Sequence, residues 1–255
     1  MSDQPTTIAH ISDPQCRSEM GFRQEFKQAH RLLSKLDCEH RLVLLGNHDA
    51  RNVGDEHFAE MFGARSRELL HDTVRILGID SSEPDLDSGR VGRARYRWIE
   101  ERFSEPEDFK IVAMHHHLVP VPGTGRERNI VYDAGDVLRV LASCGTDLVL
   151  CGHKHVPNVW RLEDMLIVNA GTACSHRLRG KVHACYNIVE IHDGSRVRVL
   201  LKEPYTNARV VVDYRGVHKH YCNWRSGAAG SEEVDSGGME PVPNEGTAEA
   251  PEGEE

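Results

Sequence analysis

The sequence lacks the features that would place the chain in or across a membrane. It contains no run of about eighteen apolar residues, so no segment is long enough to span a bilayer as a helix. The N-terminus, MSDQPTTIAHISD, has neither the basic start nor the apolar stretch of a secretory signal peptide. We therefore expect a cytoplasmic protein.

The sequence also lacks closely spaced pairs of cysteines. The seven cysteines are an odd number, and no CxxC pair occurs among them. This pattern argues against a disulfide framework and against a cysteine zinc knuckle, and most of the thiols are expected to be small buried groups. Histidine is abundant instead: sixteen residues, several of them clustered.

The net charge of −9 comes from one end of the chain. The segment from Ser226 onward holds nine of the 40 acidic residues and no Lys or Arg, so the remaining 31 acidic residues balance the 31 basic ones. Residues 1–225 therefore have no excess of positive charge that would attract nucleic acid, and nucleic acid is not an expected partner. We expect one domain over residues 1–225 and a disordered acidic tail over residues 226–255.

Apolar periodicity predicts alternating strands and helices, followed by antiparallel strands. The expected strands are residues 6–12, 41–45, 74–79, 110–114, 147–151, 165–169, 182–191, 196–201 and 209–214, and the expected helices are residues 22–36, 56–62, 93–103 and 133–142, the last with Asp133 as its N-cap. This order predicts a layered α/β sandwich with mixed sheets.

Four short polar motifs each follow an expected strand: residues 12–15 (SDPQ), 46–49 (GNHD), 115–117 (HHH) and 152–155 (GHKH). Any one of them could be an ordinary turn or a solvated loop. The carboxyl ends of neighbouring strands, however, meet in one crevice of an α/β sheet. The four motifs together therefore predict one site rich in Asp, Asn and His, a donor set that suits zinc, manganese, iron or cobalt.

GNHD, a later histidine pair and then GHKH, each after a strand, resemble the calcineurin-like metallophosphoesterases, in particular their cyclic-nucleotide phosphodiesterase branch. The resemblance covers about residues 6–191. It implies a four-layer α/β/β/α sandwich and one or two divalent ions (Mn, Fe, Zn or Co). It also implies a small phosphate-ester substrate.

The resemblance also implies a role for each matching residue. Asp13 and His155 would bind the first metal, with Gln15 at a position where the family usually has histidine. Asn47, His115 and His153 would bind the second.

His48 would contact the phosphoryl oxygen or protonate the leaving group, and Asp49 would orient His48. The implied reaction is hydrolysis of phosphodiesters or phosphomonoesters by in-line attack of a metal-bound water. Arginines of the loop at residues 122–129 could meet the substrate phosphate, or that loop could be simply solvated. Residues 169–172 (NAGT) are expected to form a turn beside the site.

One departure from the family pattern concerns the region before Asn47. No GDxxD motif, which would supply a carboxylate shared by both metals, occurs between Asp13 and Asn47. We interpret the short interval as the loss of one strand and one helix near residues 16–18, with Glu19 or Glu25 as candidate replacement carboxylates. Two alternatives to an active hydrolase follow: a catalytically degenerate relative that binds metal or nucleotide, and an unrelated structural zinc protein.

Overall fold

The computed structural model describes residues 4–14, 20–105, 109–124, 130–175, 178, 182–193 and 195–215 of the 255-residue chain. Its helices are α1 (Arg23–Leu33), α2 (Gly54–Phe62), α3 (Arg93–Arg102) and α4 (Ala134–Ser143). Its strands are β1 (Thr6–His10), β2 (Arg67–His71), β3 (Val74–Ile79), β4 (Phe109–Met114), β5 (Leu148–Cys151), β6 (Asn158–Leu162), β7 (Met165–Asn169), β8 (Tyr186–His192), β9 (Arg196–Lys202) and β10 (Arg209–Arg215).

The described strands form two sheets. The six-stranded sheet has the order β2-β3-β4-β5-β7-β6, in which β3, β4, β5 and β7 run parallel while the two edge strands are antiparallel to their neighbours. The four-stranded sheet, β1-β8-β9-β10, is antiparallel throughout. The expected α/β class with a mixed sheet is confirmed.

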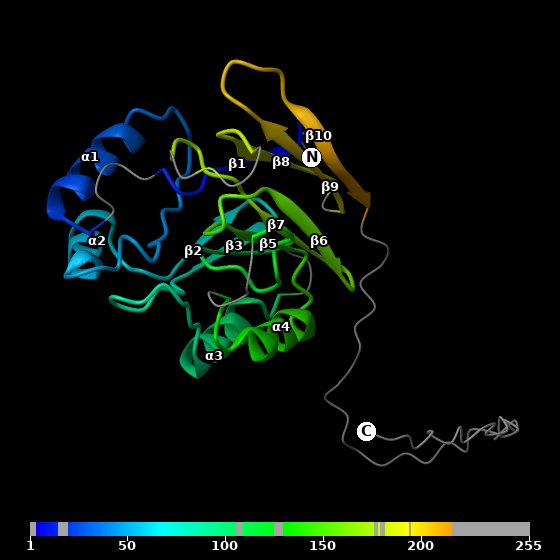
Figure 1. Ribbon diagram of the computed structural model, residues 1–255. Helices are drawn as coiled ribbons and strands as arrows, with labels where there is room; N and C mark the ends of the chain where they lie inside the picture. The colour runs from blue at the N-terminus through cyan, green and yellow to red at the C-terminus, as the bar shows by residue number, and fades with distance from the viewer. Residues whose placement is uncertain are drawn as a thin grey trace, which may run out of the picture. The chain divides into compact units, whose positions relative to one another are not determined.

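Alternating burial explains how the layers hold together. Along β8 and β9 every second residue is buried, so each strand presents one apolar face to the six-stranded sheet. The central parallel strands are buried on both faces: Ile111 of β4 packs toward the four-stranded sheet, and Val112 packs toward α3 and α4. Figure 1 shows α3 and α4 together below the six-stranded sheet, on the side away from β8 and β9.

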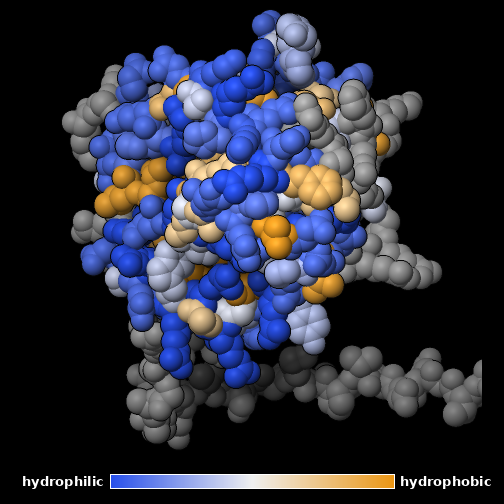
Figure 2. Space-filling model, turned by 90° about the vertical axis from the view of Figure 1, so that its left-hand side faces the viewer, coloured by the Kyte–Doolittle hydropathy of each residue, from blue (hydrophilic) through white to orange (hydrophobic). Residues whose placement is uncertain are grey.

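The helices α1 and α2 lie to one side of the two sheets (Figure 1). They pack on each other and on the segment before α2 through a small core that contains Phe26, Leu45 and Phe58. Figure 2 shows this side of the molecule, which is mainly hydrophilic with apolar side chains in separate small patches.

The predicted strand at residues 41–45 is wrong: these residues join no sheet. Leu42 and Leu44 lie against Gly78 of β3, and Leu45 is fully buried. Two backbone carbonyls of this segment accept hydrogen bonds from side chains: Arg67 donates to Val43 O (3.3 Å), and Ser82 donates to Leu45 O (3.1 Å). A continuous apolar run indicates that a segment is buried, but a buried segment need not pair with a strand.

Two edge strands, β2 and β6, were not predicted. Both are antiparallel partners at the two ends of the six-stranded sheet, and most of their side chains are only partly buried or exposed. Their sequences therefore carry little of the apolar alternation that marks a strand.

Asp133 occupies the N-cap position of α4 as predicted, but its side chain makes no capping hydrogen bond there. Its carboxylate accepts hydrogen bonds from Val91 N (3.0 Å) and Gly92 N (2.7 Å) at the start of α3. The residue thus ties the first turns of α3 and α4 together. Among the described residues, no helix has the length and apolarity needed to cross a membrane.

Candidate metal centre

Three of the four polar motifs follow strands in the structure. His115 comes directly after β4, and His153 comes two residues after β5, the parallel neighbour of β4. The two loops are joined where Gly152 N donates to His115 O (2.9 Å). Asp13 arrives from the other sheet, three residues after β1, and Asn47 follows the extended segment at residues 41–46. The residues therefore converge from four separate parts of the chain.

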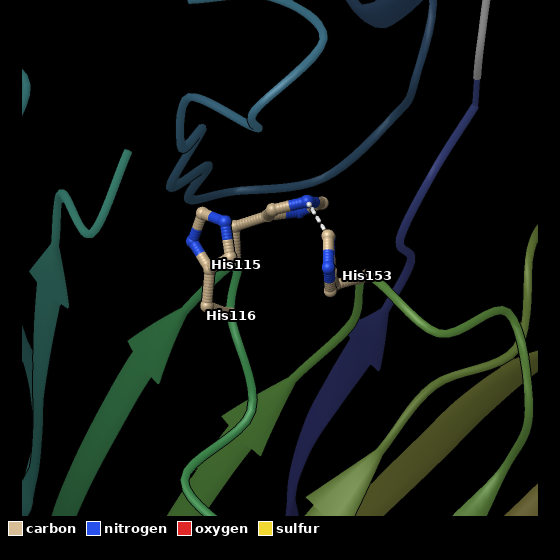
Figure 3. Close-up of side chains that lie close together, drawn as sticks. All are labelled: His115, His116 and His153. Carbon is tan, nitrogen blue, oxygen red and sulfur yellow. Dashed lines mark hydrogen bonds between the residues drawn. The ribbon is translucent and has the colours of Figure 1, made fainter. Parts of the chain in front are cut away.

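Asn47 forms the centre of the first group of ligand atoms. Its amide oxygen lies 2.9 Å from His115 Nε2 and 3.2 Å from His153 Nδ1, and these two nitrogens are 3.2 Å apart. Figure 3 shows the His115 and His153 side chains pointing toward each other, with a dashed line between them, and the two rings are nearly perpendicular (80°). Three atoms that can bind a metal thus surround one point.

Asp13 and His155 form the second group. His155 Nε2 lies 3.3 Å from Asp13 Oδ1, and Asp13 Oδ2 accepts a hydrogen bond from His153 N at 3.0 Å. That backbone bond joins the two groups, because His153 contributes its ring to one group and its amide to the other. Both Asp13 and His155 are buried.

Three of the nine described non-glycine residues with positive φ angles belong to this site. Asp13, His153 and His155 adopt positive φ angles of 50°, 71° and 58°. This region is unfavourable for residues other than glycine and costs on the order of 1–3 kcal/mol per residue. Strain of this kind persists where the surrounding structure requires it, and such positions are concentrated at functional sites.

Burial keeps the imidazoles neutral. It lowers the pKa of His115, of His116 and of His153 below the ordinary value of 6.5. For Asp13, burial opposes ionisation, but His115 and the hydrogen bonds from His155 and Ser12 outweigh it, so the pKa of Asp13 lies well below its usual range. Neutral imidazole and ionised carboxylate are the forms that bind metal ions.

Several supporting residues were not singled out from the sequence. Asp87 Oδ1 accepts from Asn47 Nδ2 (3.1 Å) and from Arg51 (2.8 Å), which turns the amide oxygen of Asn47 toward the histidines. Ser12 donates to Asp13 Oδ2 (2.6 Å), and Thr172, in the predicted NAGT turn, donates to Asp13 O (2.8 Å). Ser12 lies in the predicted SDPQ motif and Thr172 in the predicted NAGT turn, but neither side chain was given a role, and Asp87 had no signal in the sequence.

His116 is buried behind the site. Its Nδ1 lies 2.9 Å from Ser81 Oγ and its Nε2 lies 3.3 Å from Asp87 O, so both ring nitrogens already contact protein atoms. Its ring packs on that of His153 with centroids 4.7 Å apart. His116 therefore supports the His153 ring. One ring nitrogen of His116 also lies within 4.8 Å of the ligand atoms of His115 and His153.

His48 and Asp49 directly follow Asn47 and lie in the same turn. His48 lies in the turn that Ala50 N closes on Gly46 O (3.0 Å), and Asp49 Oδ2 accepts from Gly46 N (3.0 Å). The roles of His48 and Asp49 stay predictions. Gln15 lies outside the described residues, as do Glu19 and residues 125–129 of the predicted phosphate-contacting loop.

Glu25, the other candidate replacement carboxylate, accepts hydrogen bonds from Phe22 N (3.0 Å) and Met20 N (3.3 Å) at the start of α1. These contacts are those of a helix cap, which satisfies amide groups at a helix N-terminus.

The separations between the ligand atoms match what a shared metal ion requires. Ligands bound at about 2.0–2.2 Å to one ion lie roughly 3.0–3.5 Å from each other. The Asn47, His115 and His153 atoms are 2.9–3.2 Å apart, and the Asp13 and His155 atoms 3.3 Å apart. Imidazole, amide and carboxylate donors suit borderline divalent cations. The fold and the donor set are those of a class of protein: α/β sandwiches in which loops at the ends of strands carry side chains that can hold a divalent metal ion.

The chain belongs to the calcineurin-like phosphoesterase superfamily, whose domain model matches residues 25–194. A probable cyclic nucleotide phosphodiesterase of Xenorhabdus bovienii is 27% identical over 137 residues, which cover 52% of this chain and 53% of that protein. A probable cyclic nucleotide phosphodiesterase of Psychrobacter is 32% identical over 124 residues, which cover 44% of this chain and 36% of that protein. The chain thus spans about half or less of the length of these relatives.

The fold is also similar to that of a solved structure, the purple acid phosphatase PPD1 of yellow lupin. The TM-score is 0.50 at 13% sequence identity, and the match covers 65% of this chain and 36% of the phosphatase. At this identity the likeness concerns the fold alone.

Proposed function

We propose that this protein is a metal-dependent phosphoesterase that hydrolyses small phosphodiesters or phosphomonoesters, with cyclic nucleotides as the leading substrate class. The observation that carries the proposal is the position of the Asn47 amide oxygen between His115 Nε2 and His153 Nδ1. The family membership and the names of the two bacterial relatives support the reaction and the substrate class.

Asp13 and His155 would hold one divalent ion, with Gln15 as a further donor, and Asn47, His115 and His153 would hold a second. The donor chemistry fits manganese, iron, zinc or cobalt. When bound, such an ion supplies Lewis-acid polarisation of the phosphoryl group and lowers the pKa of a water ligand.

The chain's own residues would prepare this site. The low pKa of Asp13 favours its ionised form and the lowered pKa values of His115 and His153 favour their neutral forms, so these three ligands need not lose a proton on binding. His48, next to Asn47 in the tight 46–50 turn, would donate a proton to the leaving oxygen of the ester, and Asp49 would orient the His48 ring. Small phosphate esters would be the partners, and residues 1–225 would form the functional domain.

One observation favours the alternative, a catalytically degenerate relative that binds metal or nucleotide. Glu25, which could have replaced the missing shared carboxylate, is engaged in capping α1. Without a shared anion, two neighbouring cations repel each other with less compensation, so the second ion would bind weakly.

The test is hydrolysis of a chromogenic aryl phosphodiester with manganese present, compared between wild type and His48→Ala. Removing a general acid is expected to lower kcat by about 10²–10⁴-fold while metal content stays unchanged. Asn47→Ala is expected to lose bound metal as well as activity. Wild-type turnover no faster than that of His48→Ala, with metal still bound, would support the degenerate alternative and overturn the hydrolase.

A further inference from the structure

A second group of metal-ligating side chains lies outside the centre described above. Glu39 and His40 belong to the connection that follows α1, and His71 is the last residue of β2. One ligand atom from each of the three residues lies within 4.8 Å of the other two. His40 Nε2 is 3.5 Å from Glu39 Oε1, and the His40 and His71 rings meet edge to face with centroids 5.0 Å apart.

The turn between β2 and β3 brings a fourth polar group to this cluster. Asp72 follows His71 with a positive φ of 50°, and its Oδ2 lies 3.8 Å from His71 Nε2. The register that pairs His71 with Val74 fixes this tight turn, and hence the position of His71 at the end of the sheet. The cluster therefore joins two segments that are separated by some thirty residues in the chain.

Two imidazoles and one or two carboxylates form a donor set typical of zinc. Ligand atoms around a tetrahedral zinc ion lie roughly 3.4 Å apart, given bond lengths of about 2.0–2.2 Å. The Glu39 and His40 atoms already have this separation, and small rotations of the partly exposed side chains would close the longer distances. Exposure of the side chains also gives an ion direct access from solvent.

We propose that Glu39, His40 and His71 form a surface zinc site, distinct from the centre at Asn47, with Asp72 or water as the fourth ligand. The ion binds the connection after α1 and the β2–β3 turn at the same time, and we call this metal-mediated link the clip. The segment at residues 41–46, which leads from this clip to Asn47, pairs with no strand in the described part of the chain. Zinc at its beginning therefore anchors a segment that the sheets do not hold.

Zinc stoichiometry tests the proposal directly in the full-length protein. Wild type and His40→Ala/His71→Ala are dialysed against micromolar free zinc at neutral pH, and bound zinc per chain is measured by elemental analysis. The double variant is expected to bind one ion fewer than wild type, whatever the occupancy of the other centre. Equal stoichiometry in the two proteins would overturn the site.

Two controls separate this site from adventitious binding. His183→Ala removes an exposed histidine outside the cluster and is expected to bind as much zinc as wild type. Cys38→Ser removes an exposed thiol beside the cluster, whose sulfur accepts from Arg41 Nε (3.1 Å), and is expected to retain the ion. Loss of the ion in Cys38→Ser but not in His40→Ala/His71→Ala would overturn the assignment.

Hydrogen exchange gives a readout of the clip itself. Zinc is expected to slow amide exchange over residues 36–43 and 69–74 of wild type, and to leave these amides unchanged in His40→Ala/His71→Ala. The comparison does not depend on any phosphoesterase activity. Equal zinc protection of the two segments in wild type and in the double variant would contradict the clip.

Discussion

Asn47 owes its orientation to a neighbouring carboxylate. An amide can present either its oxygen or its nitrogen to a metal, but only the oxygen is a useful ligand. Asp87 accepts hydrogen bonds and cannot donate them when ionised, so it binds the amide nitrogen of Asn47 and leaves the oxygen facing His115 and His153. The hydrogen bond from Arg51 lowers the pKa of Asp87 and keeps it ionised.

Asp87→Ala is therefore expected to weaken metal binding at Asn47 by about 10–100-fold, as removal of an outer partner of a ligand commonly does. The measurement is metal affinity by competition with a chromogenic chelator. Asp85→Ala is the matched control, because Asp85 lies in the same loop and accepts from Asn52 N without touching Asn47. Equal losses in the two variants would show that Asp87 acts only through the fold of the loop.

Residue types and their grouping predicted much of the centre. Asp13, Asn47, His115, His153 and His155 were all expected together, and the structure brings them together. The contacts of Asp87 and of the Ser12 hydroxyl were not expected, because a carboxylate or hydroxyl in a polar loop has no pattern of its own. Their importance depends on which side chain they face.

At the scale of the elements, α2 begins in contact with the turn that carries His48. Gly54, the first residue of α2, lies so close to this turn that an added Cβ would stand 1.8 Å from Asp49 O. The close approach fixes the 46–50 turn against the helix. Gly135 near the start of α4 has no atom within 4 Å of its virtual Cβ and serves as the comparison.

Gly54→Ala is expected to lower the free energy of unfolding by about 2 kcal/mol or more, because a backbone oxygen cannot move out of the way cheaply. Gly135→Ala is expected to raise it by about 0.5–1 kcal/mol, since alanine loses less entropy in a helix. Urea unfolding measures both. A Gly54→Ala protein as stable as Gly135→Ala would contradict the tight contact.

The elements themselves were mostly predictable. Helices α1 to α4 and the strands with strong apolar patterns lie near their predicted positions. The errors share one cause: the segment at residues 41–45 is apolar because it is buried against β3, whereas β2 and β6 are strands with little apolar signal. Hydrophobicity indicates how deeply a segment is buried, whereas its pairing in a sheet depends on whether another strand lies beside it.

At the scale of the whole molecule, a polar contact links the two sheets. Asn187 of β8 lies 3.4 Å from His10 Nδ1 of β1, and its Nδ2 donates to Asn169 O of β7 in the other sheet (3.3 Å). A protonated His10 would place a second donor against this amide. Burial lowers the pKa of His10 to about 4, while the nearby Asp13 carboxylate opposes the shift.

Acid should therefore destabilise the fold over a defined range. The unfolded chain binds a proton on His10 with a pKa near 6.5, whereas the folded chain binds it only near 4. Stability is fully present above pH 6.5, falls as pH drops from 6.5 to 4, and changes no further from this group below 4. The loss attributable to His10 is on the order of 3 kcal/mol.

The measurement is urea unfolding of wild type and His10→Gln across this pH range. Other buried histidines contribute in both proteins, so the difference between the two curves isolates His10. The His10→Gln protein is expected to lose less stability on acidification. Parallel curves would mean that His10 titrates alike in the folded and unfolded chains.

Apolar periodicity determined the fold class and most of the elements, and the grouping of polar motifs after strands indicated which side chains would come together, while their roles as metal ligands follow from the family resemblance and stay predictions. Tertiary structure decided the rest: which atom of Asn47 faces the histidines, which backbone angles Asp13, His153 and His155 adopt, and that residues 41–46 remain outside the sheets. These features depend on contacts between segments distant in the chain, and a linear pattern of residues does not contain those contacts.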